Sequence, residues 1–164
     1  MNVIRVERGE LTHLFRAVAN APSALAPFYG MSRAIRTQTK LPARLRELVI
    51  LTTACTLGNE YQIAEHTLMA LREGLTREEV RDIMAGVYSR FSECERVAAT
   101  FAKALSSGGD CSPETFADLE RHFTPGNIVE LTLTVGWYHL VAVVIRALDI
   151  DLEPGRLASR GGNE

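Results

Sequence analysis

The stretch LPARLRELVILTTACTLGNEYQIAEHTLMALREGLTREEV, residues 41–80, decides the fold, because its helix start and stop signals are unusually dense. Pro42 suits the first position of a helix, and Gly58 fits the left-handed residue that ends one. Asn59 can then cap a second helix, which Gly74 ends. The stretch therefore predicts two consecutive helices joined by a tight turn.

Each of these two helices carries one side chain that can exchange protons. Glu47 lies on the first helix and His66 on the second. Imidazole titrates near neutral pH, and a carboxylate beside it can orient it for general acid or base catalysis. We predict that the two side chains meet within hydrogen-bond reach, about 3 Å or through one water. Structural roles stay open, because the helix dipole favours an acid near a helix N-terminus and one hydrogen bond can satisfy a core histidine.

The rest of the chain shows the same kind of helix signals. Thr76 with Glu79, and Ser92 with Glu95, form two capping boxes, each of which predicts a helix start. Ser-Pro and Thr-Pro pairs open two further helices at residues 112 and 124. The expected helices run over residues 9–20, 24–37, 42–57, 59–73, from 76, over 92–105, from 113 and from 125.

The chain is predicted to be one all-α domain. Its 164 residues, of which 46% are hydrophobic and 23% charged, are typical of a single globular domain. Only residues 3–6 alternate as a strand would, and they do so weakly. We predict seven or eight helices in a single domain over residues 1–155, followed by a tail over residues 156–164 that is expected to be flexible.

Charge and composition exclude several classes of partner. A net charge of −2 gives no long-range attraction to nucleic acid or to an anionic membrane. Residues 128–148 are apolar and about long enough to span a membrane, but Glu130, His139 and Arg146 interrupt them, so we predict a helix buried on most sides, in the core or at a subunit contact. Three cysteines without a Cys-x-x-Cys pair or zinc-ligand spacing predict a reducing cytoplasm and no metal site.

Five further residues are candidates for the site. Arg46 could bind a substrate carboxylate through its guanidinium, and Tyr61 could donate a proton to an oxyanion. Gln62 lies one helical turn before the histidine and is expected to contact substrate. Trp137 and His139 could line an apolar pocket that has one polar contact. For each of them a surface charge, a helix cap or ordinary ring packing is the competing interpretation.

Two segments together resemble a known family. Residues 41–80 and the later stretch IVELTLTVGWYHLVAVVIRALDIDLEP, residues 128–154, are similar in order and separation to the carboxymuconolactone decarboxylase family, which includes the alkylhydroperoxidase AhpD-like proteins. The resemblance is carried by an Arg-Glu pair, an apolar run, a helix break, a helix with one histidine, and a Gly-Leu-Thr. It implies an all-α AhpD-like fold and a homo-oligomer, commonly a trimer or a hexamer.

The resemblance also bears on the chemistry. The peroxidase-like branch opens the histidine helix with a Cys-x-x-Cys, and this chain has Asn59 and Gln62 at those two positions. The disulfide-relay mechanism is therefore not implied. Glu47 and His66 match the acid and histidine positions of that branch, and Tyr61 stands just before the second missing cysteine.

The sequence favours a cofactor-free lyase or isomerase acting on a small carboxylated or carbonyl compound. His66 would act as the general acid or base, Glu47 would orient it, and Tyr61 or an arginine would stabilise a developing enolate. Two alternatives stay open. One is an AhpD-like antioxidant protein that uses Cys55, and the other is a non-catalytic oligomer that binds a small ligand.

Overall fold

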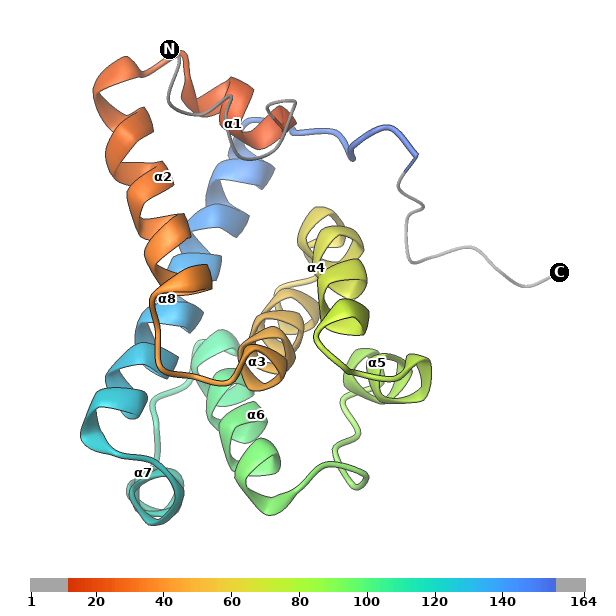
Figure 1. Ribbon diagram of the computed structural model, residues 1–164, viewed down its shortest axis with the longest axis vertical. Coiled ribbons are helices and arrows are strands. Elements are labelled where there is room, and N and C mark those ends of the chain that lie inside the picture. Colours follow the sequence, from red (N-terminus) through yellow and green to blue (C-terminus); the bar gives the residue numbers. More distant parts are fainter. Residues whose placement is uncertain (1–11, 156–164) are drawn as a thin grey trace, which may run out of the picture.

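A computed structural model describes residues 12–155, which are helical with short connections (Figure 1). The predicted all-α fold with seven or eight helices is confirmed, since this part of the chain contains eight helices and no strand. The strand candidate at residues 3–6 lies outside the described residues. The division into a domain of residues 1–155 and a tail of residues 156–164 stays a prediction for the same reason. The helices are α1 (His13–Val18), α2 (Pro22–Thr37), α3 (Ala43–Thr56), α4 (Glu60–Arg72), α5 (Arg77–Met84), α6 (Glu93–Ser106), α7 (Pro113–His122) and α8 (Pro125–Ala147).

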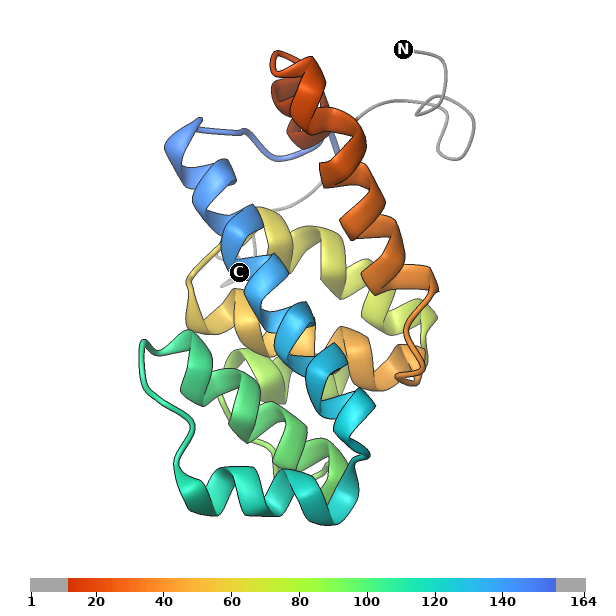
Figure 2. The ribbon, with the colours of Figure 1, turned by 90° about the vertical axis from the view of Figure 1, so that its left-hand side faces the viewer.

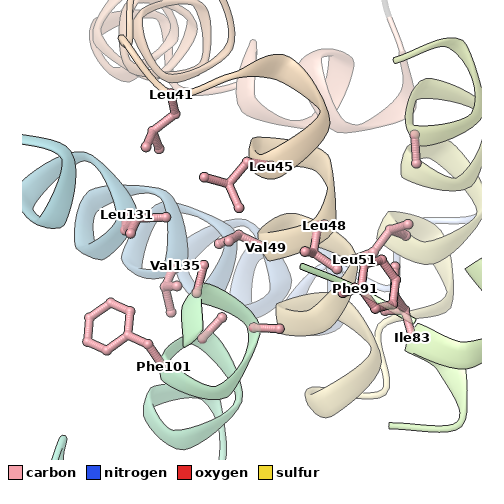
Figure 3. Close-up of a cluster of buried hydrophobic side chains, with 14 of the residues drawn as sticks. Leu41, Leu45, Leu48, Val49, Leu51, Ile83, Phe91, Phe101, Leu131 and Val135 are labelled. Atoms are coloured by element: carbon pink, nitrogen blue, oxygen red, sulfur yellow. The ribbon is translucent and has the colours of Figure 1, made fainter. Parts of the chain in front are cut away.

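Helix α3 forms the centre of the molecule. Every residue from Leu45 to Ala54 is buried, and four consecutive apolar side chains beginning at Leu48 have no exposed surface. Because no face of this segment reaches solvent, α3 is surrounded by other helices, and it packs against α4, α6 and α8. Figure 3 shows Leu45 and Val49 on the side of α3 that faces Leu131 and Val135 of α8. Leu51 lies on another side, beside Phe91 and Ile83. Helix α3 thereby fixes where its neighbours lie.

Local chemistry sets the ends of the helices around α3. Gly58 has φ +63°, the left-handed conformation that a side chain would strain, and it ends the α3 segment as expected. Asn59 then caps α4, because its side-chain oxygen accepts from the backbone N–H of Gln62 at 3.0 Å. Both predicted capping boxes, at the starts of α5 and α6, are present. The α3–α4 hairpin is thus specified by short-range signals.

Helices α1 and α2 form an outer layer against α8. Figure 2 shows α2 running beside α8, with α1 above it and the segment after α8 returning towards α1. The structure starts α2 at Pro22, two residues earlier than expected, because a proline has no N–H to lose at the first helical position. This layer leaves a space between α2, α4 and α8.

Helix α8 is buried on one face and not on most sides. It is long and apolar enough to cross a membrane, and it is the one such helix among residues 12–155. Its inner face packs on α3 and α6, whereas Val129, Leu133, Leu140 and Val143 are exposed. Such a row of apolar side chains suits a contact with another surface. The homo-oligomer stays a prediction.

Arg44 joins α3 to α5 and α6. Its guanidinium donates to Glu79 at 2.6 Å and to Glu95 at 2.8 Å. The hydrogen bond from Arg44 is the largest of the causes that lower the pKa of Glu79. A carboxylate whose pKa is lower in the folded state stabilises the fold above its ordinary pKa and loses that contribution as the pH falls.

We therefore expect Arg44→Met to lower the free energy of unfolding by about 1–2 kcal/mol near neutral pH, and by much less at about pH 3. Urea titrations at the two pH values measure this difference. The control is Arg81→Met, which breaks an exposed pair with Glu78 and should leave the free energy of unfolding almost unchanged at both pH values. An equal loss for Arg44→Met at both pH values would show that packing, and not the ion pairs, carries its effect.

Candidate active site

A buried acid–imidazole pair joins α3 to α4. His66 Nδ1 lies 2.8 Å from Glu47 Oε2, and the two residues are 6% and 2% exposed. The predicted contact is confirmed. Because an ionised carboxylate can only accept hydrogen bonds, the proton of the neutral ring lies on Nδ1. His66 Nε2 has no hydrogen-bond partner among residues 12–155, so it is the nitrogen left for chemistry.

Neighbouring side chains hold this pair in place. Arg46 Nε lies 4.0 Å from Glu47 Oε1, on the side of the carboxylate away from the imidazole. The ring of Tyr138 meets the His66 ring edge-on, with centroids 4.8 Å apart and planes at 87°. Burial, followed by the Glu47 charge, raises the pKa of Tyr138. The two rings and the two charged groups together fix the direction of the imidazole.

A partly open cavity of about 60 Å³ lies beside His66, with room for a few water molecules, or for part of a small ligand that extends through its open side. It occupies the space between α2, α4 and α8, and α1 closes one end. Most of the surface of its wall is apolar, although half of the lining residues carry a polar group, and such a mixture is found in small-molecule sites. The apolar wall includes Leu14, Phe15, Phe28, Met69, Trp137, Tyr138 and Val141, and the polar groups belong to Thr12, Ser32, Arg36, Tyr61, Gln62, Glu65 and His66.

Tyr61 lines this cavity, but its hydroxyl is already used. It donates to Glu153 Oε1 at 2.6 Å, and the same oxygen accepts from the backbone N–H of His13. Burial, then the hydrogen bond with Glu153, raises the pKa of Tyr61. Glu153 belongs to the segment after α8, so the tyrosine ties that segment to α4. To donate to an oxyanion, the Tyr61 hydroxyl would first have to break its hydrogen bond with Glu153.

The structure separates the other sequence candidates. Gln62 and Trp137 line the cavity, and their contact with a substrate stays a prediction. Arg46 does not line the cavity, because its guanidinium lies beside the Glu47 carboxylate. His139 does not line it either, and its Nε2 lies 3.1 Å from Ser106 Oγ of α6. His139 is two residues after Trp137, so at about 100° per residue its side chain points about 200° away from the wall that Trp137 forms.

Arg36 is a cavity residue that sequence reasoning missed. It lies in the last turn of α2, one and two helical turns after Ser32 and Phe28, and all three line the cavity. Their spacing of four residues places them on one face of the helix. That spacing was available in the sequence, but the face that turns to a cavity depends on how α2 docks against α8.

The site can therefore move a proton but does not place a thiol or a metal cluster beside it. Cys55 lies outside the cavity wall, and burial raises the pKa of its thiol to about 11. Among residues 12–155 no three His, Cys, Asp or Glu side chains are placed to hold a metal ion. What the arrangement offers is an oriented imidazole at the wall of a largely apolar space.

Comparisons with known proteins agree with this architecture. The chain resembles the debrominase Bmp8, solved in complex with 2,3,4-tribromopyrrole, with a TM-score of 0.81 and 20% identity over 92% of this chain and 82% of that one. An uncharacterized peroxidase-related protein of Ralstonia eutropha with an alkylhydroperoxidase AhpD core gives a TM-score of 0.80 and 14% identity, over 95% and 87% of the two chains. At these identities the likeness shows a shared fold.

Sequence comparison goes further than the fold. An uncharacterized protein of Cupriavidus necator is 32% identical over 77 residues, which are 46% of this chain and 68% of that protein. The model of the carboxymuconolactone decarboxylase family matches residues 22–109, which include α2 to α6 and both members of the acid–imidazole pair. Because that match covers more than half of the chain, this protein belongs to the carboxymuconolactone decarboxylase family.

Proposed function

We propose that the protein is a lyase or isomerase that uses its own side chains for acid–base catalysis on a small carboxylated or carbonyl compound. The observation that carries this proposal is the 2.8 Å contact between Glu47 and His66 beside the cavity. An acid that orients an imidazole and stabilises its protonated form is a recurring device for proton transfer. Membership in a family described as decarboxylases supports the reaction class.

The proposed proton transfer follows from the geometry. His66 Nε2 takes a proton from a carbon next to a carbonyl group, and the electron pair of that C–H bond moves onto the carbonyl oxygen as an enolate. Glu47 stabilises the imidazolium that forms. Where a C=C bond is conjugated with that enolate, the imidazolium returns its proton to the far carbon of the dienolate, which shifts the double bond and completes an isomerisation.

Decarboxylation would use the same two residues, but His66 would act as an acid and not as a base. His66 begins protonated, and a carboxylate next to an activated carbon leaves as carbon dioxide. The electrons of the broken C–C bond stay on the substrate as an enolate. His66 then donates its proton to the carbon that lost the carboxylate.

A thiol-based antioxidant activity has less support. A thiolate is the reactive form of cysteine, and burial keeps Cys55 protonated near neutral pH. Asn59, which stands where the peroxidase-like branch has its first cysteine, accepts a hydrogen bond from the backbone of Gln62 as a helix cap. Neither position supplies a redox partner for Cys55.

Proton exchange with solvent tests the proposal directly, because it requires no assumption about the product. Small keto acids, hydroxy acids and unsaturated lactone carboxylates are incubated with the protein in D₂O and followed by ¹H NMR. We expect at least one compound to take up deuterium at a carbon next to its carbonyl, or to release carbon dioxide with deuterium in its place. Tight binding of such compounds with no exchange and no product would favour a ligand-binding protein over an enzyme.

A further inference from the structure

We infer that the cavity binds a small anion that also carries a hydrogen-bond donor, with Arg36 holding the anionic group and Gln62 accepting from the donor. The proposed anion site lies in the same cavity as the proposed proton transfer. This assignment rests on the proposed function only for the reaction that follows binding.

Gln62 presents a buried acceptor that nothing in the described chain satisfies. The residue is 2% exposed, and its Nε2 donates to the backbone carbonyl of Tyr138 at 3.0 Å. A carbonyl can only accept, so the amide has to face it with its NH₂ group, and Oε1 lies on the other side. Gln62 Oε1 is buried and has no hydrogen-bond partner among residues 12–155. A buried acceptor left unmet is costly, and an O–H or N–H of a ligand would satisfy it.

The positive charge of Arg36 is likewise unpaired among residues 12–155. The residue is half-buried and lines the cavity, yet its guanidinium makes no hydrogen bond or ion pair with the part of the chain that the structure describes. Arg44, by contrast, is held by two carboxylates. Arg36 and Tyr138 line the same cavity, and the charge of Arg36 opposes the rise in pKa that burial and Glu47 cause at Tyr138. A free guanidinium at a cavity wall suits a planar anion, which it can hold through two parallel hydrogen bonds.

The charged side chains around the cavity favour the binding of an anion on one side of it. Glu65 also lines the cavity, and its charge, with that of Glu153, contributes to the raised pKa of Tyr61 after burial and the hydrogen bond. Glu65 lies one helical turn after Tyr61 on the α4 wall, and Arg36 places a positive charge on the α2 wall. An anion is attracted to the Arg36 wall, and a hydrogen-bond donor on the same ligand would face Gln62.

The walls indicate the body of the ligand. Phe28 and Trp137 stand 4.6 Å apart between ring centroids, at 53°, and both face the cavity. Aromatic walls favour a flat, apolar body over a branched or strongly hydrated one. The structure thus assigns the cavity to an aromatic or unsaturated carboxylate that bears a hydroxyl or an N–H.

Ligand binding in the cavity can be followed by the NMR signal of Trp137. Trp137 is the single tryptophan of the chain and lines the cavity, so its indole N–H gives one NMR peak that reports occupancy. The probes are the three hydroxybenzoates, benzoate, which lacks the hydroxyl, and phenol, which lacks the carboxylate. The variant is Arg36→Met, and the control is Arg33→Met, which removes an exposed arginine one turn earlier that does not line the cavity.

We expect one hydroxybenzoate to bind more tightly than benzoate and phenol. Arg36→Met should weaken both carboxylates about 10- to 100-fold and leave phenol within about twofold, and Arg33→Met should leave all probes within about twofold. Gln62→Met should remove the advantage of the hydroxybenzoate over benzoate. Unchanged carboxylate binding in Arg36→Met would overturn the anion assignment, and equal binding of benzoate and every hydroxybenzoate by the unaltered protein would overturn the role of Gln62.

These outcomes are separate from those that test the proposed function. His66→Gln should still bind the hydroxybenzoate, because the binding groups are Arg36 and Gln62. If the unaltered protein binds the probes as expected but exchanges no proton of any compound, the catalytic proposal fails and the binding assignment stands. If exchange occurs while Arg36→Met binds carboxylates normally, the reverse holds.

Discussion

His66→Gln is expected to lower kcat by about 10²- to 10⁴-fold on any compound that the protein turns over. Glutamine fills much of the space of the ring and can still hydrogen-bond to Glu47, but its amide cannot carry a proton near neutral pH. The fold should persist, because α3 is held mainly by the apolar contacts of its other faces. Rates of deuterium uptake or product formation, compared under saturating substrate, measure the effect.

The chain offers a matched control for this experiment. His139 is also a partly enclosed histidine with one hydrogen bond, but it contacts Ser106 and lies away from the cavity. His139→Gln should therefore keep kcat within about twofold of the unaltered protein. Rates in His66→Gln that equal those of the control would remove His66 from the mechanism.

Glu47→Gln is expected to have the second largest effect, a loss of about 10²- to 10⁴-fold in kcat. The carboxylate accepts the Nδ1 proton and so leaves Nε2 bare towards the cavity. An amide of the same size can instead donate to Nδ1, which moves the ring proton to Nε2 and removes the base. It also cannot stabilise the imidazolium as a carboxylate does.

Glu130→Gln is the control for the acid. Glu130 lies on α8, where it accepts from the backbone N–H of Lys40, and it does not line the cavity. Its replacement should change stability slightly and kcat not at all. A Glu47→Gln variant that folds and keeps at least half of the normal kcat would mean that the acid is structural.

Much of the fold could be predicted because its determinants are local. Gly58 and Asn59 set the turn between α3 and α4, and the capping boxes at Thr76 and Ser92 set the next two helix starts. Each of these signals acts within about one turn of helix, so it can be recognised in the sequence. The predicted helix ends over residues 42–105 accordingly agree with the structure to within about two residues.

The candidate site was predictable only in part. Glu47 and His66 lie on consecutive helices joined by a tight turn, so a contact between them follows from one hairpin. Arg36 and Glu153 reach the cavity region from segments whose docking depends on packing against α8 and α1. His139 was misplaced because a long apolar helix does not reveal which of its faces lies inward. The residues that the sequence did not place correctly depend on long-range packing, whereas the Glu47–His66 contact depends on one local hairpin.

The acid–imidazole pair is tested most directly by the tautomer of His66 in solution. Two-bond ¹H–¹⁵N correlation spectra of the unaltered protein, recorded over a series of pH values, distinguish a protonated ring nitrogen from a bare one. His66→Gln identifies the peaks. We predict a proton on Nδ1, held by Glu47, and a bare Nε2 whose shift changes when a ligand enters the cavity. A neutral ring with its proton on Nε2, or a ring insensitive to Glu47→Gln, would contradict the acid–imidazole pair as the catalytic base.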